Sequence, residues 1–378
     1  MFERQAAGIQ SLMWINDKSG DFITTSKTVG ALKIWNVAQQ NPKKMVKIVP
    51  SGIGSSHASP GAGRSIFPLA IMPIQEYNNL VLIACTNGSI ALFNIEKKKI
   101  EFQTEPGHSE TIFDLQFKPT DKNTLASCSY DGTVKLWDAP SMKMLLSFHT
   151  SKKKGVIGHS TKQEAGGENT IYAISWAPDS DNIACMCGKG WVKIFNTKKG
   201  TLKNEIKPGN KGFRVAWNQL DSKYILSSSS DGYVYLLEFE EDTKELVVRR
   251  KFNHNKHSTY GVNWNNHLSD RFATGCDDGL IRIFDLSYTE NDGLIKALKG
   301  HSSRVFNIKW HPHSKNVLAS GSNDHTIRVW NVEEGTSLVL KGHTNYVRGL
   351  VWNNEIPWFL ASGSWDCQIR IWDTRTGI

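Results

Sequence analysis

The sequence has no long apolar run, because its longest apolar stretches, such as Leu80 to Cys85, are far shorter than a membrane-spanning helix. Its first residues also lack the apolar core of a secretory signal peptide. With 39% hydrophobic and 21% charged residues among 378, the composition is neither disordered nor collagen-like. We therefore expect a soluble, cytoplasmic globular protein without membrane insertion.

Cysteine is scarce, and the six cysteines form no CxxC pair, so we expect buried, reduced thiols. Cys185 and Cys187 alone give a weak metal motif, because no partner CxxC or HxxxH follows them. The glycine-rich segment 51–65 lacks the GK[ST] ending and the following helix of a phosphate-binding loop. The sequence therefore predicts no metal, no nucleotide and no other cofactor.

Positive charge is concentrated in the first half of the chain. Residues 1–210 hold 25 Lys and Arg against 17 Asp and Glu, whereas the remaining residues hold 20 against 19. Short lysine runs carry this excess, at residues 43–44, 97–99, 152–154 and 198–199. Such runs attract RNA or an acidic partner, but they also occur simply as solvated turns. Nucleic-acid or acidic-partner binding through these loops is therefore an alternative function.

One spacing of four residue types occurs three times. It places His, Ser, Asp and Trp at constant steps: His108, Ser127, Asp131 and Trp137; His301, Ser320, Asp324 and Trp330; His343, Ser362, Asp366 and Trp372. A Ser/His/Asp set suggests a hydrolase, yet nothing here matches the GxSxG nucleophile elbow. Repetition in each unit favours a structural network over a single active site. A hydrolase is thus the less favoured alternative, and we expect no enzyme activity.

Alignment on the tryptophan of this spacing gives eight repeat units. They end near residues 36, 94, 138, 196, 238, 285, 331 and 373, with 42 to 58 residues between successive ends. Units of 40 to 45 residues with GH near the start and WD near the end are typical of propeller blades. The longer intervals contain insertions at 51–65 and 151–169, which we expect to be flexible loops.

A single unit shows how the secondary structure is arranged. Residues 111–117, 124–129, 133–137 and 144–148 are short segments rich in β-branched and aromatic residues, and turn residues separate them. Each unit is therefore predicted to be a four-stranded antiparallel sheet. Because one such sheet cannot bury both faces alone, the units should pack against one another as an all-β propeller of seven or eight blades.

These repeats resemble the WD-repeat β-propeller family over nearly the whole chain. The resemblance implies that the His, Ser, Asp and Trp of each unit form a hydrogen-bonded network inside one blade. A narrower likeness, at residues 107–114, 231–232 and 346–366, is to the later repeats of one longer member, so the chain is either a fragment or a shortened relative. The last unit stops before an outer strand, and residues 1–7 are a candidate for that strand.

The resemblance also implies where a partner binds. In this family, contacts often come from the residue that starts the first strand of a blade and from the residue two positions earlier. They also come from the residue before the aspartate of the repeated spacing, here called the turn aspartate. From these positions we select eleven candidates for partner binding: Phe113, Tyr130, Tyr172, Lys211, Phe213, Tyr260, Arg304, Phe306, Tyr346, Arg348 and Trp365.

Aromatic residues and arginine dominate interface hot spots, and they make up most of this set. The sequence therefore predicts a non-catalytic scaffold that binds peptides or domains of other proteins, with no small-molecule substrate. The alternative is that these rings pack against one another only to fix the geometry of the blades.

Overall fold

The computed structural model describes most of the chain in strands and turns. The described residues are 9–15, 20–26, 31–39, 42–47, 68–73, 79–85, 88–97, 99–103, 107–139, 141, 143–150, 170–240, 242–243, 245–253, 257–366 and 369–377. They belong to two compact units, unit 1 (Met1–Ile112 with Gly300–Ile378) and unit 2 (Phe113–Lys299). Within these residues there are eight antiparallel sheets, seven of four strands and one of three. No described helix is long and apolar enough to span a membrane.

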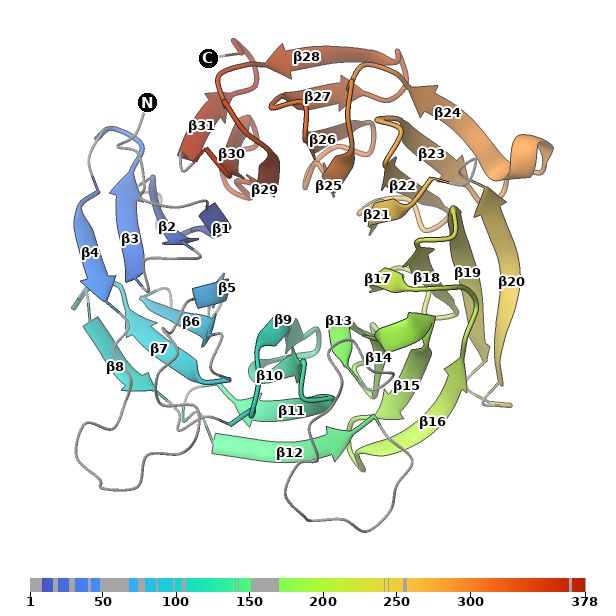
Figure 1. Ribbon diagram of the computed structural model, residues 1–378, viewed down its shortest axis with the longest axis horizontal. Coiled ribbons are helices and arrows are strands. Elements are labelled where there is room, and N and C mark those ends of the chain that lie inside the picture. Colours follow the sequence, from blue (N-terminus) through green and yellow to red (C-terminus); the bar gives the residue numbers. More distant parts are fainter. Residues whose placement is uncertain are drawn as a thin grey trace. The chain divides into compact units, whose positions relative to one another are not determined.

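Unit 2 consists of four four-stranded sheets in chain order (Figure 1). The strands are β9 (Ile112–Lys118), β10 (Asp121–Ser129), β11 (Thr133–Asp138) and β12 (Lys143–His149); β13 (Ile171–Trp176), β14 (Asn182–Cys187), β15 (Val192–Asn196) and β16 (Thr201–Ile206); β17 (Gly212–Trp217), β18 (Tyr224–Ser229), β19 (Tyr233–Glu240) and β20 (Glu245–Asn253); β21 (Thr259–Trp264), β22 (Arg271–Cys276), β23 (Ile281–Asp285) and β24 (Leu294–Leu298). Short 3-10 segments connect β14 to β15 at Gly188–Gly190 and β23 to β24 at Glu290–Gly293.

Unit 1 holds the other four sheets, two from each end of the chain. The strands are β25 (Val305–Trp310), β26 (Val317–Ser322), β27 (Ile327–Asn331) and β28 (Thr336–Leu340); β29 (Val347–Trp352), β30 (Phe359–Ser364) and β31 (Ile369–Asp373); β1 (Ile9–Trp14), β2 (Asp21–Ser26), β3 (Ala31–Asn36) and β4 (Lys44–Lys47); β5 (Pro68–Pro73), β6 (Leu80–Cys85), β7 (Ile90–Asn94) and β8 (Lys99–Gln103). The predicted all-β propeller is confirmed, with eight blades; seven have four strands, and the β29–β31 blade has three within the described residues.

The sequence of each strand reflects its position in the sheet. The second strands are almost entirely buried and use small residues, such as Ala-Ser-Gly-Ser in both β26 and β30. A Cβ added to Gly321 in β26 would lie 3.0 Å from Val347 of the next sheet, so small residues let neighbouring sheets approach closely. The outer strand β20 instead alternates buried and exposed residues, as expected for a strand with one solvated face.

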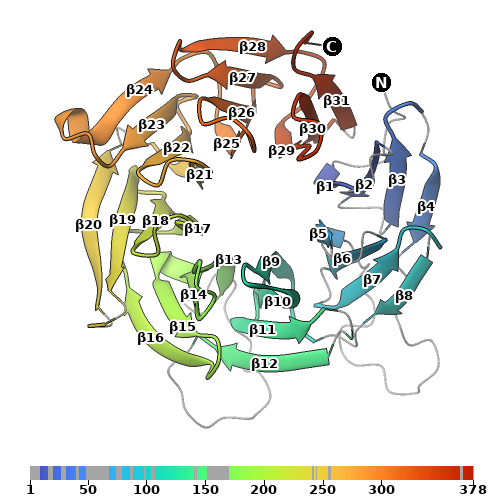
Figure 2. The same cartoon turned by 180° about the vertical axis from the view of Figure 1, so that it is seen from behind.

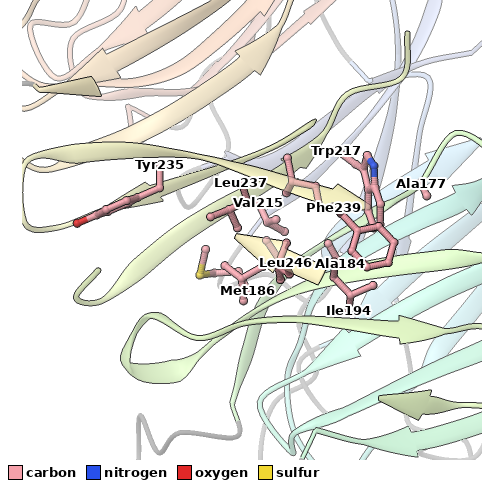
Figure 3. Close-up of a cluster of buried hydrophobic side chains, with 13 residues drawn as sticks. Ala177, Ala184, Met186, Ile194, Val215, Trp217, Tyr235, Leu237, Phe239 and Leu246 are labelled. Carbon is pink, nitrogen blue, oxygen red and sulfur yellow. The ribbon is translucent and has the colours of Figure 1, made fainter. Parts of the chain in front are cut away.

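Apolar cores lie between neighbouring sheets within each unit. In unit 2, Met186 of β14 and Ile194 of β15 pack with Trp217 of β17 and Leu237 of β19, and all four are nearly inaccessible to solvent (Figure 3). Burial of one such large side chain stabilises the fold by about 1.5–3 kcal/mol. Because sheets such as β17–β20 contribute residues to the cores on both of their faces, no such sheet is expected to be stable alone.

In unit 1 the first and last sheets of the chain pack directly against each other. Trp14, Phe22 and Trp35 of the first sheet form one buried cluster with Ala361 of β30. The first strands of the sheets follow the same order, with β25 beside β29, β29 beside β1, and β1 beside β5. In unit 2, β13 lies beside β17 and β17 beside β21 (Figure 2). The first strands therefore form a continuous inner edge in each unit.

Five cysteines lie within the described side chains, and all five are free and buried, as predicted. Burial raises the pKa of Cys85 and Cys187 to about 12, so these thiols stay protonated at neutral pH. Cys367 lies outside the described residues, as do the insertions 51–65 and 151–169 and the segment 1–7. The expectations of flexible loops and of a closing strand at these segments stay predictions.

Candidate protein-binding site

A hydrogen-bonded chain of four side chains braces the sheet that contains β26 and β27. The Trp330 indole donates to Ser320 Oγ at 2.8 Å, and Ser320 Oγ lies 2.8 Å from His301 Nε2. His301 Nδ1 in turn lies 2.7 Å from Asp324 Oδ2. The hydrogen-bonding capacity of all four side chains is satisfied if Ser320 donates to Nε2 and the Nδ1–H of a neutral His301 donates to the carboxylate.

The next sheet repeats this brace with the same geometry. His343, Ser362, Asp366 and Trp372 are joined by three contacts of 2.8 Å. In unit 2 the Trp137 indole likewise donates to Ser127 Oγ at 2.8 Å. The predicted structural role of the spacing is therefore visible in atomic contacts.

The hydrolase alternative conflicts with this geometry. Ser127, Ser320 and Ser362 are fully buried, with an exposed fraction of 0% each. Each hydroxyl is also occupied by an indole donor. A nucleophilic serine must reach its substrate beside an oxyanion hole, and a buried serine that two side chains hold inside a sheet does not.

The aspartate of the brace also fixes the turn that follows the second strand. Asp324 accepts hydrogen bonds from the backbone N–H groups of Ser302 and Thr326 at 3.0 and 2.9 Å. Burial alone would raise the pKa of Asp324, but the bonds from His301 and Thr326 outweigh it and hold the pKa well below the usual range for Asp. The carboxylate therefore stays ionised and keeps the turn in one conformation.

Two incomplete repeats replace the histidine with another partner for the aspartate. In the sheet of β19, the Tyr235 hydroxyl donates to Asp231 at 2.8 Å. In the sheet of β23, Arg282 pairs with Asp278 at 2.6 Å. The sequence analysis missed both partners. The sequence does contain a signal for these partners. A Lys, Arg or Tyr recurs two residues before the position that aligns with the tryptophan of the spacing, at Lys33, Lys135, Lys193, Tyr235, Arg282, Arg328 and Arg370.

One recurring backbone hydrogen bond positions the predicted binding residues, in complete and incomplete repeats alike. The residue before the turn aspartate donates its N–H to the carbonyl of the residue immediately before the first strand. This bond joins Trp365 to Tyr346 at 3.0 Å and Asn323 to Arg304 at 2.9 Å. In unit 2 it joins Ser230 to Lys211 at 2.9 Å. Residues about 20 positions apart in the sequence thus lie side by side at the end of each sheet.

In unit 1 five predicted residues form one group, here called the arginine cluster: Arg304, Phe306, Tyr346, Arg348 and Trp365. The Arg348 guanidinium carbon lies 3.2 Å from the Phe306 ring centroid and 4.8 Å from that of Trp365. Arg304 stacks on the same Phe306 ring at 5.4 Å. The Tyr346 and Trp365 centroids are 5.4 Å apart. The indole of Trp365 is 44% exposed.

In unit 2 the other six predicted residues form a second group, here called the aromatic cluster: Phe113, Tyr130, Tyr172, Lys211, Phe213 and Tyr260. The Phe113 centroid lies 6.0 Å from that of Tyr130 and 5.5 Å from that of Tyr172. Lys211 Nζ lies 5.9 Å from the Tyr172 ring and 5.8 Å from the Phe213 ring. The Phe213 and Tyr260 centroids are 4.7 Å apart. Phe113 is 40% exposed.

The structure therefore brings every predicted binding residue into contact with another one of its own unit. The basic loops behave differently. Lys43 forms an ion pair with Asp21 at 2.7 Å, and Lys198 forms one with Asp181 at 2.8 Å. These pairs neutralise part of the positive charge that RNA would need. Residues 152–154 lie outside the described part of the chain.

Comparison with known proteins gives one family. The WD domain, G-beta repeat family matches residues 100–138, 293–331 and 335–373. WD repeat-containing protein 1 of Xenopus tropicalis is 26% identical over 344 residues, which cover 82% of this chain and 53% of that protein. Coronin-7 of Homo sapiens is 28% identical over 45% of this chain and 17% of its own length. The chain thus spans about half, or less, of these two relatives.

Two further matches extend the comparison. Protein transport protein sec13 of Emericella nidulans is 25% identical over 60% of this chain and 78% of that protein. The crystal structure of the computationally designed Ika8 protein matches the fold with a TM-score of 0.73, 18% identity and 98% coverage of both chains. The narrower likeness to WD repeat-containing protein 17 stays a prediction, because these matches do not test it. WD-repeat propellers are generally scaffolds for protein interaction, and this chain is similar to the WD-repeat family in its matched repeats and in these relatives.

Proposed function

We propose that this chain is a scaffold that binds peptides or domains of other proteins at the arginine cluster and the aromatic cluster. The observation that carries the proposal is the contact of eleven aromatic and cationic side chains along the inner edges of the two units. Trp365 and Phe113 expose 44% and 40% of their surface at this edge. Exposed aromatic groups of this kind usually mark contact surfaces.

The chemistry of both clusters suits protein recognition. Rings held by backbone hydrogen bonds, such as Tyr346 and Trp365, bury a large area on binding and lose little conformational entropy. Burial, with a smaller effect of Tyr130, raises the pKa of Tyr172, so its hydroxyl stays protonated and can donate a hydrogen bond. Arg348 and Lys211 add cations that recognise carboxylates and orient the partner.

The competing explanation is that the rings only fix the geometry of the blades. To separate the two, Arg348→Ala and Trp365→Ala are combined in one variant, which is used as bait for crosslinking and mass spectrometry. We expect this variant to lose its partner while its melting temperature stays nearly unchanged, because Trp365 is exposed and neither side chain belongs to the apolar clusters described above.

The same unit provides a matched control pair. The Arg375 guanidinium stacks on Trp358 at 4.3 Å, and Trp358 is 37% exposed, but neither residue belongs to a cluster. Arg375→Ala combined with Trp358→Ala should therefore keep the partner. Full partner recovery by the Arg348/Trp365 variant would refute the proposal. A large fall in its melting temperature would instead favour the purely structural explanation.

A further inference from the structure

The guanidinium of Arg348 lies close to two aromatic rings. Its carbon lies 3.2 Å from the Phe306 centroid and 4.8 Å from the Trp365 centroid. The main chain is fixed as well, because Asn307 Nδ2 donates to the Arg348 carbonyl at 3.0 Å. A guanidinium carries its N–H donors in one plane, and this planar fork matches a planar acceptor such as a carboxylate.

A second cation strengthens the preference for an anion. Arg304 lies 5.4 Å from the same Phe306 centroid. The two guanidinium carbons are therefore no more than about 9 Å apart, which is about one Debye length in physiological salt. Within that distance the fields of two cations add and attract a negatively charged group. The exposed indole of Trp365 next to them offers an apolar surface.

We propose that the arginine cluster recognises the carboxylate of an Asp or Glu in an extended peptide, together with an apolar side chain beside it. A guanidinium can bind a carboxylate through two parallel hydrogen bonds, and the apolar neighbour packs on Trp365 and Tyr346. This inference rests on the proposed function and adds the chemistry of the partner. The partner is an acidic peptide, and a phosphate or a neutral backbone group would be a different ligand.

The test starts from a displayed library of random 12-residue peptides selected on the full chain. We expect the selected peptides to share an Asp or Glu next to an aromatic or aliphatic residue. In synthetic peptides, Asp→Asn or Glu→Gln should weaken binding about tenfold to a hundredfold, the usual effect of losing a charge-assisted hydrogen bond. Arg348→Lys should weaken binding by a similar factor, because an ammonium keeps the charge but loses the planar fork.

The decisive measurement is whether the effect of changing Arg348 depends on the presence of the peptide carboxylate. On Arg348→Gln, the acidic peptide and its amide analogue should bind equally weakly, whereas on Arg375→Ala they should differ as on the wild type. If binding needs Trp365 but tolerates the amide analogue, the carboxylate inference fails while the proposed function stands. If no selected peptide depends on any residue of either cluster, both fail. Tighter binding of a phosphoserine analogue would assign the site to phosphate instead.

Discussion

Removal of one hydroxyl, by Ser320→Ala, tests whether the repeated brace holds a blade together. Ser320 Oγ satisfies two buried groups, the Trp330 indole N–H and His301 Nε2, both at 2.8 Å. Trp330 is 1% exposed and His301 is 6% exposed, so water cannot replace the lost hydroxyl without rearrangement. Each buried polar group that loses its partner costs roughly 1–3 kcal/mol. We expect Ser320→Ala to lower the free energy of unfolding by about 2–4 kcal/mol.

Ser227→Ala is a matched control within the same chain. Ser227 is 2% exposed and occupies the equivalent place in β18, but residue 237 is Leu there and offers no indole. Its substitution should change stability by less than about 1 kcal/mol, since no buried donor is left without a partner. The difference between the two serine variants therefore isolates the hydrogen-bonded network from the effect of losing a small buried group.

The assay is guanidinium chloride unfolding followed by circular dichroism, together with native-state hydrogen exchange of β26 and β27. Hydrogen exchange reports the local free energy of opening in this sheet. In a double-mutant cycle with Trp330→Phe, Ser320→Ala should cost about 1–2 kcal/mol less than in the wild type, because the indole donor is already gone. Equal destabilisation by Ser227→Ala and Ser320→Ala, or the absence of coupling to Trp330, would refute the reasoning.

Three further predictions concern charges and turns. Because the folded pKa of Asp324 is lowered, this residue stabilises the fold above the unfolded pKa of about 3.9, and the stabilisation is lost as pH falls below that value. Unfolding midpoints are measured from pH 7 to pH 2, and the midpoint of Asp324→Asn should decrease less over this range than that of the wild type. Arg282→Ala removes the buried cation that pairs with the partly buried Asp278 and should cost roughly 3–5 kcal/mol in denaturant unfolding, whereas Arg249→Ala, at an exposed ion pair, should cost less than about 1 kcal/mol. Gly88→Ala forces a Cβ to 2.0 Å from a backbone oxygen at a φ of +82° and should lower the melting temperature, whereas Gly349→Ala, with 3.6 Å to its nearest neighbour, should change it little.

Local sequence patterns were sufficient for the strands of a repeat. The segments expected at 111–117, 124–129, 133–137 and 144–148 correspond to β9, β10, β11 and β12, with bounds that differ by at most a few residues. Alternation of apolar and polar residues and turn residues such as Asp131 act over short distances, so they can be read directly. The network of His301, Ser320, Asp324 and Trp330 was also foreseeable, through its spacing and the family that it resembles.

The contacts of the incomplete repeats were not foreseeable in the same way. Tyr235 and Arg282 each satisfy an aspartate four residues away on the same hairpin, where the histidine of the repeat is missing. Each aspartate lies in the turn between the second and third strands, and the side chain four residues later, on the third strand, reaches back to it. In the sequence, the histidine is simply missing from these repeats. In the structure, Tyr235 or Arg282 takes its place as the partner of the aspartate.

The sequence by itself determined the repeated β architecture, because it depends on short spacings within one unit, and the family that the repeats resemble supplied the braces and the candidate binding positions. Only the tertiary structure decided which of those residues touch. Arg348 stacks on Phe306, and Lys211 lies over the rings of Tyr172 and Phe213, because neighbouring sheets pack with a particular offset. That offset results from the fit of the cores between sheets, which involves many distant side chains at once and leaves no local signal in the sequence.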